Sequence, residues 1–401
     1  MKVSDLQGPG RPAGYPVGAG VTIAELSADP HPVLRRLRAA EPVSWLPALG
    51  GWLVTRADLV DRVLRDPAAF TVDDPRFTTA RVVGPSMLSL DGPEHARHRD
   101  PFARALRLPE ARARLAGTCE REAARLVGAL AASGTAAELR RGLAGQLAVS
   151  VMAEMLGLDV PPAQLLAWYD AIVAGVSALS QGTGSAAPVP PAAAAAFSQL
   201  SACVTASLER PRRPSVLTSA AGRLADSEIV SNAAVLLFGG IETTEGMTGN
   251  AIWYLLHDNA ARREVAADPS LTEVAVEESL RLEPAAAVVD RYATTSVQLG
   301  GAGIRQGDLV VVSLAAAGRD PAVYADPDRF DLRRPNARQH WAFAVGPHFC
   351  IGAQLARAQA SAALRALFGR LPGLRLDAER PSAPQGLVFR KPPSLHVRWD
   401  G

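Results

Sequence analysis

The chain has 401 residues, of which 48% are apolar and 20% are charged, so it can bury a large core. Its formal net charge of +2 gives no global signal for binding nucleic acid or an acidic membrane. Three cysteines, Cys119, Cys203 and Cys350, are an odd and sparse set that argues against a disulfide framework. The N-terminus lacks a signal-peptide pattern, and no run of about 20 apolar residues could span a bilayer. We therefore expect a cytoplasmic protein without a membrane span.

The N-terminal half combines short elements with irregular segments. The first 30 residues are rich in Gly and Pro and are expected to be an irregular surface segment, with residues 1–20 as an irregular N-terminal part of the domain. Residues 42–55 show two apolar runs around a turn, which predicts a β-hairpin. A short helix follows and ends near Asp66. Residues 71–94 carry Pro, Gly and Asp throughout and are predicted to form a long loop, whereas helices dominate from about 95 to 175.

The C-terminal half contains the longest regular pattern. Residues 180–197 form a breakpoint, either a linker or a lid. Residues 226–257 are apolar on every side in their middle, which predicts a long helix inside the protein. A helix is expected over 271–282, a β-rich stretch over 292–316, and a last helix over 351–368. The fold class predicted from these patterns is mainly α with a small β-rich region.

A ten-residue string surrounds Cys350, because residues 343–352 read FAVGPHFCIG. A thiolate that binds haem iron must reach the metal from a short, fixed loop. Gly346 and Gly352 suit such a turn, and Phe343 can pack under the ring. The helix that follows favours a thiolate at its N-terminus. A single cysteine beside glycine is more often structural, so the interpretation depends on the whole string.

The segment Gly239-Gly240-Ile241-Glu242-Thr243 places an acid and a hydroxyl inside an apolar helix. Burying a carboxylate without partners is costly, so chance is a poor explanation for Glu242. Glycine leaves no side chain, which lets a ligand or cofactor approach Gly239 and Gly240. The structural alternative is a helix kink in which Thr243 bonds back to the preceding turn.

The other charged residues, taken one at a time, indicate a functional site less strongly. Glu278 and Arg281 are three residues apart and share a helix face, which by itself predicts a surface ion pair worth under about 1 kcal/mol. His95 and Arg99 are four apart on a predicted helix. Together with two further cationic positions, these side chains can clamp two carboxylates. The two further positions are Arg291 and His348.

These motifs, in this order, resemble the cytochrome P-450 family, and the likeness runs from about residue 20 to the C-terminus. Residues 343–352 resemble the family's haem signature, Phe-x-x-Gly-x-His/Arg-x-Cys-x-Gly, which implies that Cys350 is the metal ligand. Ala344 and Gly318 depart from the pattern, since Gly and Asn respectively are more common there. The resemblance implies haem contacts at His95, Arg99, Gly239, Gly240, Arg291, Phe343, His348, Cys350 and Gly352, and a structural ion network of Glu278, Arg281 and Arg329.

What the resemblance implies is one helical domain over residues 1–401 with the cytochrome P-450 fold, holding haem b. The expected activity is a monooxygenase that uses O₂ and electrons from a ferredoxin and its NAD(P)H-dependent reductase. Thr243 is expected to organise a water at the oxygen-binding side, and Glu242 to relay protons. Arg104, Arg107 and Arg357 are expected on the surface that attracts the acidic redox partner.

Other readings of the same haem site stay open. The same oxidant can serve aryl coupling, C–C coupling or ring closure. A peroxide-driven enzyme and a non-catalytic haem sensor are less consistent with the Glu242–Thr243 pair. The expected substrate is an apolar organic molecule of secondary metabolism, with neither nucleic acid nor membrane as partner. Its predicted contacts are Ser86, Met87, Leu88, Leu236, Phe238, Ala285, Ala286, Ala287, Val288, Val289, Leu387, Val388 and Phe389.

Overall fold

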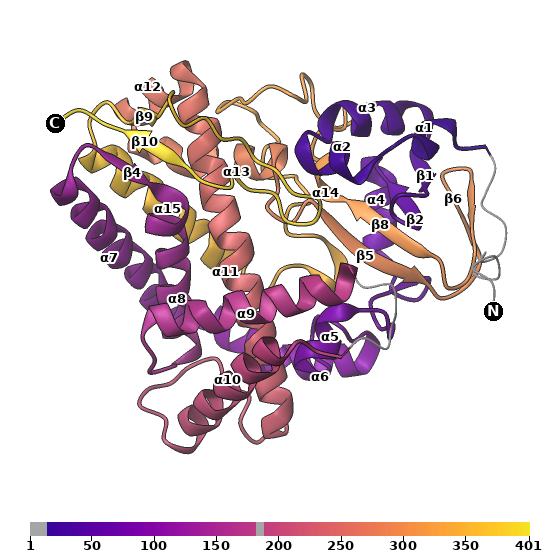
Figure 1. Cartoon of the computed structure of the whole chain (residues 1–401), viewed down its shortest axis with the longest axis horizontal. Helices are drawn as coiled ribbons and strands as arrows, with labels where there is room; N and C mark the ends of the chain where they lie inside the picture. The colour runs from indigo at the N-terminus through magenta and orange to yellow at the C-terminus, as the bar shows by residue number, and fades with distance from the viewer. Residues whose placement is uncertain (1–13, 182–187) are drawn as a thin grey trace.

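The computed structural model describes residues 14–181 and 188–401, which form a helix-rich body beside a smaller sheet (Figure 1). The long helix α11 (Asp226–His257) runs through the body and buries most of its side chains. The helices around it are α6 (Gly92–Arg107), α7 (Pro109–Ser133), the π-helical turn η2 (Arg140–Gly145), α8 (Gln146–Leu156), α12 (Asn259–Ala267), α13 (Thr272–Leu282) and α15 (Ala353–Arg370). α11 packs against η2, α8, α13 and α15. The predicted bounds of the central helix are confirmed.

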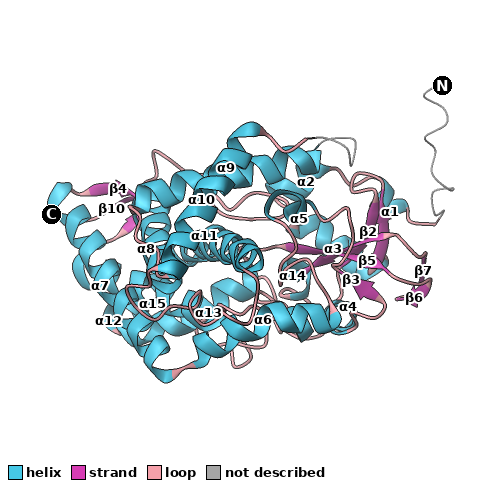
Figure 2. Cartoon of the chain, turned by 90° about the horizontal axis from the view of Figure 1, so that it is seen from below, coloured by secondary structure: helices cyan, strands magenta, loops and turns pink. Residues whose placement is uncertain are grey.

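A five-stranded sheet lies at one end of the molecule (Figure 2), with strand order β1-β2-β8-β5-β3. Its strands are β1 (Val43–Leu46), β2 (Gly51–Val54), β3 (Phe70–Thr71), β5 (Val288–Ala293) and β8 (Leu309–Ser313). The β1–β2 hairpin confirms the prediction for 42–55, and β2 runs parallel to β8. Gly51 is needed where these two strands meet, because a Cβ there would lie 2.9 Å from the Leu309 carbonyl.

Shorter strands and helices make up the rest of the described structure. One three-stranded sheet has the order β4-β10-β9, and β6 pairs with β7. The elements are α3 (His31–Ala40), α4 (Ala57–Arg65), β4 (Ala136–Glu138), β6 (Val297–Leu299), β7 (Ala302–Ile304), β9 (Arg375–Leu376), β10 (His396–Arg398), η3 (Pro269–Leu271), α14 (Leu314–Ala317) and η4 (Gly346–His348). A mainly α fold with a small β-rich region is therefore confirmed.

Two segments expected to be irregular contain helices. α1 (Pro16–Ala19) lies within residues 1–20, of which 1–13 fall outside the described residues, and α2 (Ile23–Ala28) follows with a capping box at its start. The predicted loop 71–94 contains α5 (Thr78–Val83) and the start of α6. The Pro and Gly signals mark the ends of these short helices: Gly84 closes α5 with a φ of +84°.

The helices α9 (Pro162–Gln181) and α10 (Pro191–Glu209) lie on either side of the expected breakpoint at 180–197. Residues 182–187 of that breakpoint fall outside the described residues. The two helices pack on each other, and Trp168 Nε1 donates to Gln199 Oε1 at 2.6 Å. Both also contact α11, so side chains of this pair can reach the central helix.

Candidate active site

The Cys350 loop lies between η4 and the N-terminus of α15, and its backbone is tightly constrained. Gly346 has a φ of +75°, and a Cβ there would lie 2.6 Å from the Leu64 carbonyl. The Cys350 N–H donates to the Phe343 carbonyl at 2.9 Å, which closes the loop. Ala344 has a φ of +54°, in the left-handed region where glycine is favoured. The departure from the family pattern at Ala344 is therefore a strained residue.

The Cys350 sulfur is enclosed by donors. Burial raises the pKa of its thiol, while the Gly352 N–H and the guanidinium groups of Arg99 and Arg357 act to lower it. The Arg357 guanidinium also lies 4.5 Å above the centre of the Phe343 ring. The same groups would stabilise a Cys350 thiolate when the sulfur serves as a metal ligand.

Histidine and arginine side chains gather beside this loop, and two of them, His95 and Arg291, are buried. His95 and His348 face each other with ring centroids 4.3 Å apart, and His348 Nε2 lies 2.8 Å from Asp91. In the described part of the chain, His95 Nε2 is buried and has no hydrogen-bond partner. Burial lowers the pKa of His95 to about 4, with the nearby His348 adding to the effect. Burial likewise lowers the pKa of Arg291 to about 10.

The partners of two of these cations are backbone carbonyls. Arg291 donates to the carbonyl of Asp290 at 2.7 Å, and Arg99 donates to the carbonyl of Phe349 at 2.5 Å. A charged guanidinium in a buried setting is stabilised far better by an anion than by a neutral carbonyl. The structure therefore brings His95, Arg99, Arg291 and His348 to one side of the cysteine loop, as a site that accepts anionic groups.

The predicted oxygen-binding segment lies in the middle of α11, but its two glycines differ. A Cβ at Gly239 would meet nothing within 4 Å, so this glycine faces open space. A Cβ at Gly240 would collide with the sulfur of Met152 on α8. The missing side chain of Gly240 therefore makes room for helix packing, and its expected contact with the cofactor stays a prediction. Thr243 donates to the Gly239 carbonyl at 2.5 Å, the back-bonded geometry considered as an alternative.

The Glu242 carboxylate is buried and has two partners that the sequence did not reveal. Lys391 Nζ lies 2.7 Å from Oε1, and the Tyr169 hydroxyl of α9 donates to Oε2. Only one weak signal existed, namely that Lys391 is one of just two lysines in the chain. These contacts join residues far apart in sequence, which no local pattern specifies.

The ion network behind the loop has a different third member from the one expected. Arg281 makes two hydrogen bonds to Glu278, at 2.8 and 2.7 Å, and both side chains are fully buried. Arg334 Nε lies 2.9 Å from Glu278 Oε1. Arg329 is exposed and contributes only its carbonyl, which accepts from Arg281 and Arg334. The assignment of Arg329 as the ion-pairing member is therefore wrong, because the chain turn places Arg334 against Glu278.

Comparison with known proteins decides the family. The cytochrome P450 family model matches residues 215–396. The chain is 35% identical to nocardicin C N-oxygenase of Nocardia uniformis subsp. tsuyamanensis, over 96% of this chain and 98% of that protein. The chain belongs to the cytochrome P450 family.

Further relatives agree. The chain is 34% identical to cytochrome P450 monooxygenase PikC of Streptomyces venezuelae, covering 94% of this chain and 92% of that protein. It is 34% identical to mycinamicin IV hydroxylase/epoxidase of Micromonospora griseorubida, covering 90% and 94%. The crystal structure of CalO2 superposes with a TM-score of 0.85 at 30% identity, covering 94% of this chain and 99% of that one. The protein is thus a cytochrome P450 monooxygenase with the fold of that family.

This family and fold imply a haem cofactor, and the residues present fit one. In this family a haem takes a cysteine thiolate as its ligand, and its two carboxylates need hydrogen-bond donors. The Cys350 sulfur can supply the ligand, the buried His95 Nε2 has no partner among the described residues, and Gly239 leaves open space. Among the described residues, no helix of the cytochrome P450 is long and apolar enough to cross a membrane.

Some predicted substrate contacts come together in the fold. The rings of Phe238 and Phe389 meet edge to face, with centroids 5.5 Å apart. Ala286 forms a β-bridge with Phe389, and the Ala287 N–H donates to the Val388 carbonyl at 2.8 Å. The segments 285–289 and 387–389 therefore lie side by side next to α11. Val388 is 44% exposed, so this edge of the site is accessible.

Other predicted contacts are occupied by packing. Ala287, Val288 and Leu387 join an apolar cluster with side chains of α2 and α3, and Ala285 packs toward Gly246 of α11. These side chains are engaged in packing, and their expected contact with substrate stays a prediction. Ser86, Met87 and Leu236 are also buried, the last two in the core beside α9 and α10.

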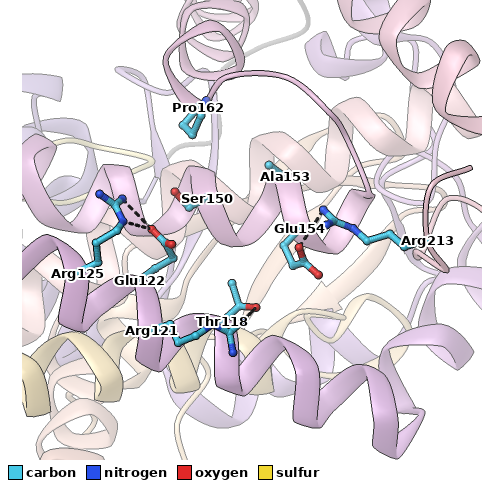
Figure 3. Close-up of a pocket in the computed structure, with 9 residues that line it drawn as sticks. All are labelled: Thr118, Arg121, Glu122, Arg125, Ser150, Ala153, Glu154, Pro162 and Arg213. Carbon is cyan, nitrogen blue, oxygen red and sulfur yellow. Dashed lines mark hydrogen bonds and ion pairs between the residues drawn. The ribbon is translucent and has the colours of Figure 1, made fainter.

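A separate hollow of about 380 Å³ lies between α7 and α8 (Figure 3). It contains no residue of the cysteine loop, and both of its glutamates are paired with arginines. Arg125 pairs with Glu122 at 2.8 Å, and Arg213 pairs with Glu154 at 2.9 Å. This polar hollow does not suit an apolar substrate.

Proposed function

We propose that this cytochrome P450 holds haem b and hydroxylates or epoxidises an apolar organic molecule of secondary metabolism, with electrons from a ferredoxin and its NAD(P)H-dependent reductase. The observation that carries the proposal is the Cys350 loop beside His95, Arg99, Arg291 and His348, in which His95 Nε2 is buried and has no partner among the described residues. The relatives support it, since their names describe an N-oxygenase and a hydroxylase/epoxidase. One catalytic unit over residues 1–401 accounts for all these features.

The chain's own residues would divide the work of holding the cofactor. Cys350 would supply the thiolate ligand, with Gly352 donating to the sulfur. His95, Arg99, Arg291 and His348 would neutralise the two carboxylates. When bound, the haem supplies the redox chemistry that activates O₂ so that one oxygen atom enters the substrate.

Proton delivery would use Thr243 and Glu242. The Thr243 hydroxyl has one donor, which is engaged by the Gly239 carbonyl, and lone pairs that remain free to accept. Turning that hydroxyl toward the open space beside Gly239 lets it hold a water there. The Glu242 carboxyl, one residue earlier on the same helix, would pass protons to this water.

Electrons would enter near the Cys350 loop. Arg104 and Arg107 lie exposed on α6, the same helix from which Arg99 bonds the carbonyl of Phe349. An exposed basic cluster raises the rate of association with an acidic ferredoxin. Arg357 does not belong to this cluster, because its guanidinium pairs with Glu277 at 2.6 Å and lies above Phe343.

The absorption spectrum of the reduced, carbon monoxide-bound protein tests the proposal. The expected band is that of a thiolate haem, and the Cys350→Ser variant loses it. Cys203→Ser is the matched control, since Cys203 is a partly buried cysteine far from the loop in sequence, and it keeps the band. A band typical of imidazole or neutral thiol in the wild type contradicts the proposal.

The substrate can be sought without knowing its identity. Displacement of water from the distal side by a bound apolar molecule shifts the Soret band from low spin to high spin. We expect apolar polycyclic or macrocyclic compounds to produce this shift, because Phe238, Phe389 and Ala286 leave an apolar surface. Phe389→Ala should weaken the shift by about tenfold in concentration, as expected for loss of one buried aromatic contact.

A further inference from the structure

The Glu242 carboxylate has both of its oxygens engaged by side chains from distant parts of the chain. Oε1 lies 2.7 Å from the Lys391 ammonium, and Oε2 accepts from the Tyr169 hydroxyl. Lys391 belongs to the C-terminal segment after α15, whereas Tyr169 belongs to α9. Exposure of the side chains is low, at 13% for Lys391 and 11% for Glu242. A carboxylate that is this enclosed takes its orientation from its partners.

The backbone of Lys391 is fixed from both sides. Its N–H and carbonyl pair with those of Gln385 at 3.2 and 3.1 Å. The neighbouring Arg390 is 2% exposed and pairs with Glu283 at 2.6 Å, and its carbonyl accepts from Asn250 of α11 at 3.0 Å. This anchored turn holds the lysine stem against α11 and leaves it little freedom.

The surface of α11 is shaped to receive that stem. Gly246, four residues after Glu242 and hence on the same face, has no side chain. A Cβ at Gly246 would lie 3.5 Å from Lys391 Cβ and 3.0 Å from Ala285 Cβ. A larger residue would push the lysine outward, so the glycine allows its approach to the carboxylate.

A second carboxylate nearby already has its own cations. Glu245 pairs with Arg140 and lies 3.3 Å from Arg141, both from η2. Lys391 lies 3.7 Å from Glu245 but 2.7 Å from Glu242. The charge of Glu245 is thus matched without the lysine, and Lys391 is the one cation in contact with Glu242 among the described residues.

We propose that Lys391 and Tyr169 are positioning residues that hold the Glu242 carboxylate beside Thr243 and so set the efficiency of proton delivery. The proposal rests on the proposed function, because it gives that role to Glu242. Without Lys391 the buried carboxylate loses its counter-charge, which favours a turn of the side chain toward solvent. The aligned carboxylate next to Thr243 is then lost. Neither Lys391 nor Tyr169 exchanges a proton with substrate in this scheme.

The pair can be observed directly, because the chain has only two lysines, Lys2 and Lys391. Labelling lysine side chains with ¹⁵N gives at most two ammonium signals in the reduced, carbon monoxide-bound holoenzyme, and Lys2→Arg assigns the one from Lys391. Shielding from water slows proton exchange, so we expect a sharp Lys391 signal that broadens or shifts in Glu242→Gln. A Lys391 signal that is the same in wild type and Glu242→Gln overturns the proposal.

The activity measurement uses as its substrate probe the compound that gives the largest Soret shift in the screen described above. Product formed per NAD(P)H is expected to fall about tenfold in Lys391→Gln, the cost of misplacing a reacting group by a fraction of an ångström. Lys391→Arg keeps the charge and should restore most of the yield, and Tyr169→Phe should show a smaller fall. The Soret shift itself stays, which shows that the variants fold and bind the probe.

Controls separate this inference from the proposed function. Lys2→Gln and Tyr15→Phe change the same residue types elsewhere and should leave the yield unchanged. If Glu242→Gln and Thr243→Ala both keep the wild-type yield, the proposed function is wrong. If those two lose yield but Lys391→Gln and Tyr169→Phe do not, only the positioning role is wrong. An equal loss in Lys391→Arg and Lys391→Gln also contradicts it, since charge would then be irrelevant.

Discussion

The charged side chains on the two sides of α11 differ in how deeply they are buried and how completely they are paired. On the side of the cysteine loop, Glu278, Arg281 and Arg334 form a buried network in which the Glu278 and Arg281 side chains have no exposed surface. On the opposite side, Glu242 and Lys391 retain slight exposure, and Thr243 borders open space at Gly239. A fully satisfied buried network fixes one geometry, whereas a partly solvated pair can exchange partners.

This difference matches what each side has to do. A sulfur ligand must stay at one position, so rigidity behind Cys350 is useful. A proton pathway must release and reform hydrogen bonds, which the Thr243–Gly239 bond beside open space can do while Lys391 keeps the Glu242 carboxylate oriented. Substitutions near the cysteine loop should therefore mainly lower the free energy of unfolding. Substitutions near Glu242 should mainly lower the amount of product formed per NAD(P)H.

The largest effect is expected at Arg334. Arg334→Met leaves Glu278 with one cation fewer and removes donors to three carbonyls, which should lower the free energy of unfolding by about 3–5 kcal/mol. Arg329→Met is the matched control and should cost within about 0.5 kcal/mol, because that side chain is exposed. Urea unfolding of the holoenzyme, followed by the Soret band, measures both. Equal costs would restore Arg329 as the network member.

Lowering the pH should reduce the free energy of unfolding, because Glu277 on the side of the cysteine loop becomes protonated. Burial raises the pKa of Glu277, but hydrogen bonds from His340 and Arg357 outweigh it and lower the pKa to about 2 from 4.5. Because the folded pKa lies below the unfolded one, this stabilisation is present above pH 4.5 and is lost as the pH falls toward 2. Between pH 5 and pH 3 the loss is about 2 kcal/mol.

The Glu277 contribution can be isolated by comparison with Glu277→Gln. The variant cannot titrate, so its unfolding free energy, measured in urea at pH 5 and pH 3, should fall by about 2 kcal/mol less than that of the wild type. Other carboxylates titrate equally in both proteins and cancel in the difference. Identical falls in the two proteins would contradict the assignment.

On the oxygen-binding side, Thr243→Ala should reduce product per NAD(P)H by about tenfold, equivalent to about 1.4 kcal/mol, while unfolding free energy changes little. Thr243→Ser keeps the hydroxyl and should recover most of the yield. The probe is the compound with the largest Soret shift, and released peroxide accounts for the missing electrons. An unchanged yield in Thr243→Ala means that the hydroxyl does not deliver protons.

Sequence patterns predicted the elements whose signals are local. The apolar stretch 226–257 corresponds to α11 at both ends, and the hairpin at 42–55 follows from its turn and flanking apolar runs. The predicted loop 71–94 is wrong because short helices carry too few residues to show a period, and their bounding Gly and Pro dominate the pattern. The last helix continues through Gly369 to Arg370, since glycine can end a helix but need not.

The site was predicted where a family motif exists and missed where contacts are long-range. His95, Arg99 and His348 lie beside the Cys350 string, whereas the roles given to Thr243 and Glu242 stay predictions. Lys391 and Tyr169 were not predicted, because 149 positions separate Lys391 from Glu242 and neither residue has a local pattern. Arg334 was missed because Arg329 stands in a more recognisable string, whereas the turn that decides between them is a property of the fold.

The smallest effect concerns the two departures from the family pattern, which should respond in opposite directions. Ala344→Gly removes a left-handed alanine, and the gain of about 1 kcal/mol is partly offset by the greater freedom of glycine in the unfolded chain. Gly318→Ala should instead destabilise, because a Cβ there would collide with the carbonyl of Arg281. Thermal unfolding of the two variants measures both signs. If Ala344→Gly lowers the midpoint while keeping the thiolate spectrum, the left-handed backbone at Ala344 carries no strain.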